Sequence, residues 1–129
     1  MFHKKPNKQE IGQRGEDVAA KYLEERGFKV IDRNYRRPWG EIDLVVQRDK
    51  EVGFIEVKTV SRVTLSEDDY EPEDNLHPWK LKRLRRIIQT YVLAKNFDDD
   101  IDWQVDVISV YLDLAGETLK IDWLEDITP

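Results

Sequence analysis

Asp43, Glu56 and Lys58 are the residues of this sequence whose types and spacing are best suited to chemistry. They lie in the stretch GEIDLVVQRDKEVGFIEVK, residues 40–58, which is typical of two short strands joined by a polar turn. Side chains alternate between the two faces of a strand, so Glu56 and Lys58 share a face, as do Glu41 and Asp43. Two carboxylates on neighbouring strands repel each other, and burying both destabilises a sheet unless a cation lies between them. That cation is either Lys58 or a divalent metal beside it.

The length of the turn decides which residues face each other across this hairpin. A two-residue turn at Asp49 and Lys50 places Asp43 opposite Glu56. A four-residue turn over residues 49–52 places Asp43 opposite Lys58 instead. The sequence leaves both registers open, and either one predicts that Asp43, Glu56 and Lys58 form one patch on one face of the sheet.

All-oxygen ligand sets suit Mg²⁺ or Mn²⁺, which take few protein carboxylates and keep several waters. Such a metal lowers the pKa of a bound water and offsets charge on a phosphodiester, while a neighbouring lysine stabilises the transition state. An aspartate followed by Glu-x-Lys on the next strand therefore favours metal-dependent phosphodiester chemistry, with a structural ion network as the alternative. The chain has no cysteine and two histidines, which excludes thiolate sites and argues against a histidine-based site.

A helix is expected before the hairpin, from about residue 9 to residue 26, with Gly27 at its end. Its apolar stripe at helical spacing consists of Ile11, Gly15, Val18, Ala19, Tyr22 and Leu23. Glu16 is the one acid at the border of this stripe, so it could face a sheet packed beneath the helix. The alternative is a flanking glutamate whose stem covers the core.

The segment 28–35 is expected to be a strand, and the basic turn NYRRPWG, which contains Arg36, leads from it into the hairpin. Residues 62–78 are expected to form a long flexible loop. A second helix is expected over residues 78–96, with Lys80 on its inner face, either contacting phosphate or extending its long side chain to solvent. The other basic residues at the start of this helix are expected to form a solvated face, with phosphate contact as the alternative: Lys82, Arg83, Arg85 and Arg86.

Two further strands are expected at residues 103–112 and 118–123. Asp106 is a lone acid within an apolar face of the first, and we expect it to be a structural partner for an arginine rather than a catalytic residue. No P-loop, Gly-rich dinucleotide motif or internal repeat occurs.

The chain length of 129 residues favours a single domain over residues 1–129. The net charge of −6 is unevenly distributed, since residues 1–97 carry 20 Lys+Arg against 17 Asp+Glu and residues 98–129 carry one against ten. The overall charge therefore says little about the surface around the hairpin. No apolar run approaches bilayer length and the N-terminus lacks a signal-peptide core, so we expect a soluble cytoplasmic protein with no membrane partner.

Several motifs in a fixed order carry a family resemblance. They are GQRGEDVAAKYLEERGFKVIDRNYR, GEIDLVV, FIEVKT, the K-x-x-R-L pattern at residues 80–84 and VDV at residues 105–107. In these segments the chain resembles the PD-(D/E)xK nuclease superfamily, and more closely the YraN-like family of small bacterial proteins, which are similar to archaeal Holliday-junction resolvases. The resemblance implies an α/β, restriction-endonuclease-like fold with a central mixed sheet of about five strands flanked by helices.

The resemblance also implies roles for particular residues. Asp43 and Glu56 would hold Mg²⁺ or Mn²⁺, with Glu16 helping directly or through water. Lys58 would position the nucleophile. Substrate phosphates would be contacted by Lys80 and Arg36, and Glu41, which belongs to the GEID motif, would support the site from behind.

The function implied is a metal-dependent endonuclease that hydrolyses DNA phosphodiester bonds, including those of branched or junction DNA, as a homodimer. The alternative is a non-catalytic nucleic-acid-binding or scaffold protein that keeps the nuclease fold. Two positions favour the alternative, because relatives of this kind carry arginines shortly after the Glu-Val-Lys motif and two residues before the aspartate of the late strand. This chain has Val60 and Gln104 there.

Overall fold

The computed structural model describes residues 7–61 and 78–127. Along the chain it forms helix α1 (Lys8–Glu24), strands β1 (Lys29–Arg37), β2 (Gly40–Arg48) and β3 (Glu51–Ser61), helix α2 (Pro78–Lys95), and strands β4 (Asp102–Leu112) and β5 (Thr118–Leu124). Each element lies within a few residues of its expected position. The loop expected over residues 62–78 lies outside the described residues, apart from Pro78 at the start of α2.

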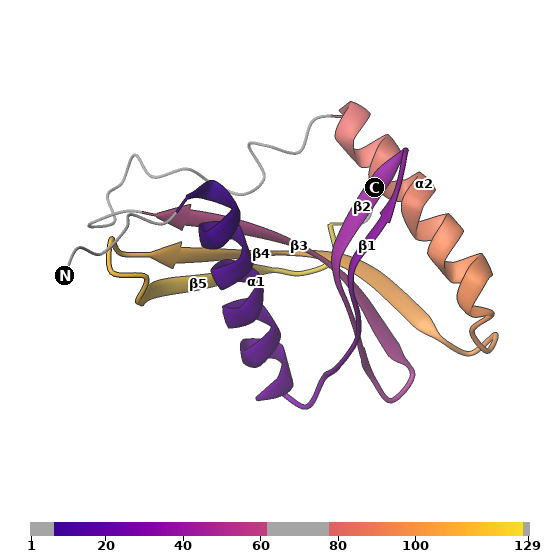
Figure 1. Cartoon of the computed structure of the whole chain (residues 1–129). Helices are drawn as coiled ribbons and strands as arrows, with labels where there is room; N and C mark the ends of the chain where they lie inside the picture. Colours follow the sequence, from indigo (N-terminus) through magenta and orange to yellow (C-terminus); the bar gives the residue numbers. More distant parts are fainter. Residues whose placement is uncertain (1–6, 62–77, 128–129) are drawn as a thin grey trace.

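The five strands form one sheet in the order β1-β2-β3-β4-β5 (Figure 1). β3 and β4 are parallel, and the other neighbours are antiparallel. The expected α/β class, with a mixed sheet of five strands flanked by helices, is confirmed. Within the described residues no helix is long and apolar enough to cross a membrane.

Local signals fix both ends of α1. The side chain of Asn7 accepts a hydrogen bond of 2.8 Å from the backbone N–H of Glu10, which caps the first turn. Beyond the helix, Gly27 has a φ of +89°, a left-handed conformation that glycine adopts without strain. The chain thereby reverses direction and enters β1 beneath the helix.

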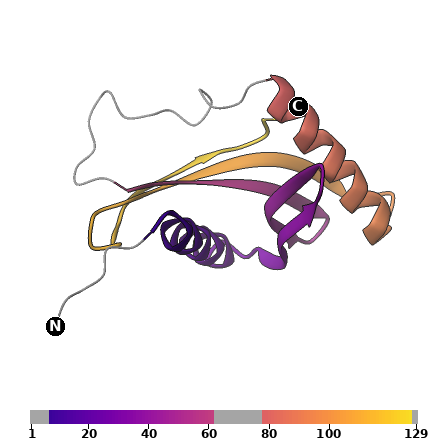
Figure 2. The ribbon, with the colours of Figure 1, turned by 45° about the horizontal axis from the view of Figure 1, so that its top comes forward.

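The two helices pack on opposite faces of the sheet, as Figure 2 shows. Ala19, Ala20 and Leu23 of α1 form one core cluster with the residues Leu44, Val46, Ile55, Ile108, Val110 and Leu112. Ile87, Ile88 and Tyr91 of α2 form the other with Ile42, Val45, Val52, Phe54 and Val105. Glu16 and the helix that carries Lys80 therefore approach the sheet from opposite sides. The sequence placed Glu16 at the border of the buried face of one helix and Lys80 on the inner face of the other, and the structure puts these two helices on different faces of the sheet.

The hairpin between β2 and β3 has the two-residue turn at Asp49 and Lys50. The paired residues run from Arg48–Glu51 to Leu44–Ile55, and Asp49 has a φ of 54°. The structure thus selects the register that directs Asp43 toward Glu56.

The pairing of β2 with β3 stops at Leu44 and Ile55, although both strands continue. β2 stays paired with β1 as far as Gly40, and β3 stays paired with β4 as far as Ser61. We call this point, with Asp43 on one side and Glu56 on the other, the strand fork. In Figure 1 the β1–β2 hairpin turns away from β3 there and lies beside α2.

Asp106 has a structural role with other partners than expected. Its side chain is buried and accepts hydrogen bonds from Trp123 Nε1 at 3.0 Å, the Asp126 backbone N–H at 2.8 Å and Gln104 Nε2 at 2.9 Å. Among residues 7–61 and 78–127 no arginine contacts it, so an arginine partner is not borne out in this part of the chain. The position where the resemblance led us to expect an arginine, Gln104, supplies one of the three donors.

Candidate functional site

Asp43 lies at the strand fork with its carboxylate directed at β3. Its Oδ2 accepts a hydrogen bond of 2.8 Å from the backbone N–H of Val57, which the interrupted β2–β3 ladder leaves without a strand partner on that side. Burial raises the pKa of Asp43 to about 7; the Val57 hydrogen bond opposes this, and the nearby carboxylates of Glu16, Glu41 and Glu56 add to it. Asp43 is therefore a half-buried acid in a locally negative environment that favours either a proton or a cation.

Glu56 and Lys58 project from β3 on the other side of the fork. Lys58 Nζ lies 3.4 Å from Glu56 Oε1, and the two side chains are only 22% and 15% exposed. By strand alternation they share the face of Phe54, which belongs to the α2 cluster. The expected neighbourhood of Asp43, Glu56 and Lys58 is present in the structure, with Asp43 between the two faces.

Glu16 reaches the fork from the opposite face because α1 crosses β3 closely. A Cβ atom added to Gly15 would overlap the side chain of Thr59, so only glycine permits this approach. Burial raises the pKa of Glu16, while a hydrogen bond from the Asn34 side chain and the charge of Arg33 lower it. One oxygen, Oε1, is buried without a hydrogen-bond partner, since Arg33 Nη2 is 3.9 Å away.

Asn34 is a site residue that sequence reasoning missed. The pairs Arg33–Leu44 and Tyr35–Ile42 place it across from Asp43 in the β1–β2 ladder, and its φ is 52°. Asparagine tolerates this left-handed backbone better than most residues, although it is unusual within a strand. The available signal was an asparagine in the middle of an otherwise β-forming segment.

Arg36 and Glu41 pair with each other at the outer side of the fork. Arg36 Nε lies 3.2 Å from Glu41 Oε1, with the side chains 69% and 39% exposed. Glu41 also contributes to the raised pKa of both Asp43 and Glu16, so it belongs to the same electrostatic neighbourhood. Lys80 lies in the first turn of α2, and its side chain is outside the described residues.

The acidic side chains at the fork offer the carboxylate oxygens that Mg²⁺ takes as ligands. Within residues 7–61 and 78–127, no three acidic or histidine side chains stand close enough together to hold a metal ion. Mg²⁺ needs only one or two carboxylates with several waters, which Asp43 and Glu56 can supply. The buried Oε1 of Glu16 without a partner and the raised pKa of Asp43 both favour a cation here.

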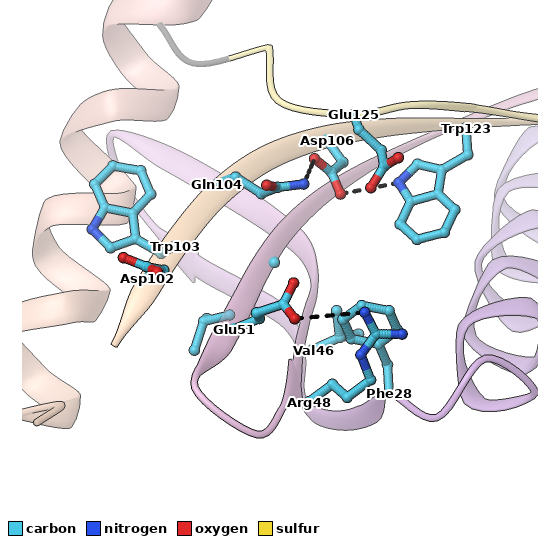
Figure 3. A pocket seen from close by; sticks show the side chains of 12 residues that line it. Phe28, Val46, Arg48, Glu51, Asp102, Trp103, Gln104, Asp106, Trp123 and Glu125 are labelled. Atoms are coloured by element: carbon cyan, nitrogen blue, oxygen red, sulfur yellow. Dashed lines mark hydrogen bonds and ion pairs between the residues drawn. The ribbon is translucent and has the colours of Figure 1, made fainter. Parts of the chain in front are cut away.

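A separate cavity of about 240 Å³ lies at the other end of β3 and β4, and Figure 3 shows its lining. Phe28 and Trp123 form part of its wall, together with the Arg48–Glu51 ion pair and the hydrogen-bonded Asp106. None of the predicted site residues whose side chains the structure describes lines this cavity. The candidate site is the strand fork rather than this cavity.

Comparison with known proteins gives the family. A family model described as uncharacterised protein family UPF0102 matches residues 15–110, which include the second half of α1, the fork and most of β4. The chain belongs to the UPF0102 family. The YraN-like resemblance drawn from the sequence is thereby confirmed.

Relatives within the UPF0102 family match nearly the whole chain. A UPF0102 protein of Caldanaerobacter subterraneus is 33% identical over 91% of this chain and 92% of its own. One from Flavobacterium johnsoniae is 32% identical over 91% and 92%, and one from Campylobacter fetus is 30% identical over 92% and 93%. The family has no assigned activity, so membership does not define a reaction.

Among solved structures, that of Pyrococcus furiosus SfsA in complex with Ca²⁺ is similar over 92% of this chain. The similar region spans 62% of the SfsA chain, with a TM-score of 0.37 and 17% identity. At this level the likeness says nothing about which residues of the UPF0102 chain are functional.

Proposed function

We propose that this protein is a metal-dependent nuclease that hydrolyses phosphodiester bonds of DNA, including branched or junction DNA. One observation carries the proposal. Asp43 and Glu56 flank the point where β2 and β3 part, and Lys58 lies 3.4 Å from Glu56. Two carboxylates and a lysine at an open strand fork can serve a phosphodiester, which must approach a cation and a nucleophile together.

Asp43 and Glu56 would hold Mg²⁺ or Mn²⁺, with Glu16 helping directly or through water. The bound metal would lower the pKa of a water molecule and offset charge on the phosphodiester. Its binding would also relieve the repulsion that raises the pKa of Asp43.

The other residues would orient the reacting groups and stabilise the charge that develops on them. The Lys58 ammonium, held near Glu56, would position the attacking water and stabilise negative charge that develops on the phosphoryl oxygens. Asn34 and Arg33 would keep the Glu16 carboxylate directed at the fork. Arg36 and Lys80 would contact phosphates on either side of the scissile bond.

The test is cleavage of labelled four-way junction, flap, duplex and single-stranded DNA with Mg²⁺ or Mn²⁺. The wild type is expected to cut at least one substrate, and Asp43→Ala to lose the activity by a factor of 100 or more, roughly the effect of removing a metal ligand. Asp99→Ala, an exposed turn residue, is the matched control. Equal behaviour of wild type and Asp43→Ala on every substrate would remove the enzymatic proposal.

A second candidate is a nucleic-acid-binding protein without turnover. It is favoured by Val60 and Gln104, which stand where the resemblance led us to expect arginines. In that case the protein binds DNA, and no metal-dependent product forms with any substrate.

The homodimer implied by the resemblance stays a prediction, which sedimentation equilibrium at micromolar concentration tests.

A further inference from the structure

Positive charge is concentrated on α2. The helix Pro78–Lys95 carries six basic residues and no acidic residue, in a chain whose net charge is −6. Within the helix, Lys82 and Arg86 are exposed. Because the helix carries no acid of its own, these exposed side chains can attract a polyanion locally even in an acidic protein.

The tip of the β1–β2 hairpin is packed against this basic helix (Figure 1). A Cβ atom added to Gly40 would lie 3.2 Å from Ile87 Cβ. Trp39 Nε1 donates a hydrogen bond of 3.3 Å to Thr90 Oγ1, and the Arg86 guanidinium lies 4.7 Å from the Trp39 ring centroid. The hairpin and α2 therefore present one continuous surface.

The hairpin adds its own arginines to that surface. The Arg37 guanidinium lies over the Tyr35 ring, 4.4 Å from its centroid, and donates a hydrogen bond of 2.7 Å to the Arg36 carbonyl. Arg36 in turn pairs with Glu41, two residues from Asp43. The basic surface thus begins at the strand fork and continues to α2.

We propose that this hairpin–helix surface, defined by Arg36, Arg37, Lys82 and Arg86, binds the phosphodiester backbone of a nucleic acid and leads it into the strand fork. Stacking on Tyr35 and Trp39 fixes two guanidinium groups and leaves N–H donors for phosphate oxygens. The second half of the proposal rests on the proposed function, because it places the scissile bond at the fork. Binding itself requires neither metal nor turnover.

The experiment measures binding of a fluorescein-labelled DNA duplex by anisotropy, in EDTA, between 50 and 200 mM salt. Arg37→Ala/Arg86→Ala is compared with Lys21→Ala/Lys29→Ala, which removes the same charge from exposed positions on α1 and the start of β1. We expect the first variant to weaken binding about tenfold or more at low salt and to reduce the slope of log K against log salt by roughly 2. The control pair is expected to stay within about twofold of wild type.

Arg37→Lys/Arg86→Lys keeps the charge and removes the planar stacking groups, and it is expected to bind between wild type and the alanine variant. Thermal denaturation shows whether each variant is folded. If the two alanine pairs weaken binding equally, or if the wild type binds no DNA at low salt, the proposal that the hairpin–helix surface binds nucleic acid is overturned. If binding follows Arg37 and Arg86 but no substrate is ever cut, this surface stands and the proposed nuclease function fails. An acidic peptide that displaces the DNA and depends equally on both arginines would identify a protein partner instead and would also overturn it.

Discussion

Asn34 and Asp43 lie across from each other in the β1–β2 ladder. At this pair each strand changes the sheet face toward which its side chains point. On β1, Arg33 turns toward Glu16 and Asp17 of α1, whereas Tyr35, two residues on, stacks against Tyr91 of α2. On β2, Leu44 packs in the α1 cluster and Ile42 in the α2 cluster. Residues two apart on a regular strand would share a face. The left-handed Asn34 therefore accompanies the twist that turns the hairpin away from β3 and opens the fork.

Replacing Asn34 separates its backbone role from its side-chain role. Asn34→Gly keeps the left-handed backbone available, so unfolding free energy is expected to change by less than about 1 kcal/mol. Asn34→Ala is expected to destabilise by roughly 1–2 kcal/mol, because alanine lacks the short polar side chain that lets asparagine tolerate a φ of 52°. Urea denaturation measures both. A larger loss of unfolding free energy in Asn34→Gly than in Asn34→Ala would contradict this account.

The same pair of variants tests the hydrogen bond to Glu16. Both remove it, so both are expected to weaken stabilisation by Mn²⁺, and the glycine variant does so in a fold that remains intact. Thermal melting at several Mn²⁺ concentrations gives the affinity.

Asp43→Asn is expected to stabilise the metal-free protein, and increasingly so as pH rises. The pKa of Asp43 is raised from 3.8 to about 7, so the folded state binds its proton more tightly than the unfolded state. The protonated Asp43 carboxyl contributes its full stabilisation of the wild-type fold below about pH 4. This contribution is lost as pH rises through about 7. The difference between variant and wild type should reach at most ~4 kcal/mol above pH 7, as read from urea denaturation between pH 4 and 8. A variant destabilised at every pH would instead support a structural ion network.

Gly15 and Gly12 form a matched pair within α1. Gly15→Ala is expected to destabilise by roughly 1–3 kcal/mol, because the new methyl group overlaps Thr59 and pushes α1 away from β3. Gly12 has no atom within 4 Å of an added Cβ, so Gly12→Ala is expected to stabilise by about 0.5–1 kcal/mol through helix propensity. Thermal denaturation of both variants at pH 7 measures these two changes in stability. Equal effects of the two substitutions would rule out the close approach of Gly15 to Thr59.

Mn²⁺ is expected to raise the melting temperature of the wild type, since a ligand that binds only the folded state stabilises it. Glu56→Ala should remove most of this gain. Glu51→Ala, an exposed acid on the same strand, should keep it. Loss of the gain in both variants, or in neither, would contradict a metal site at the fork.

Trp123→Phe tests the structural role of Asp106. The substitution removes the Nε1 donor and leaves a buried carboxylate oxygen without that partner, so a loss of about 1–3 kcal/mol is expected. DNA binding by the folded fraction should not change, because Trp123 lies at the cavity end of the sheet rather than at the fork. A selective loss of DNA binding with unchanged stability would show that this region serves function directly.

The sequence by itself determined where the helices and strands lie and which charged residues form the candidate site. Hydrophobic periodicity, Gly27 and Pro78 are local signals, and they located α1, α2 and the strands to within a few residues. The chemistry of Asp43, Glu56 and Lys58 could likewise be anticipated, because alternation along a strand depends only on neighbouring residues.

Only the tertiary structure decided how these groups meet. The register of the β2–β3 hairpin, the end of its ladder at Leu44 and Ile55, and the switch of faces at Asn34 and Asp43 depend on packing against two helices. Two of the three partners of Asp106, Trp123 and Asp126, come from the strand that pairs with β4 and from the segment beyond it. These contacts join residues far apart in the chain, where periodicity carries no information, so the strand fork emerged from the packing of the whole domain.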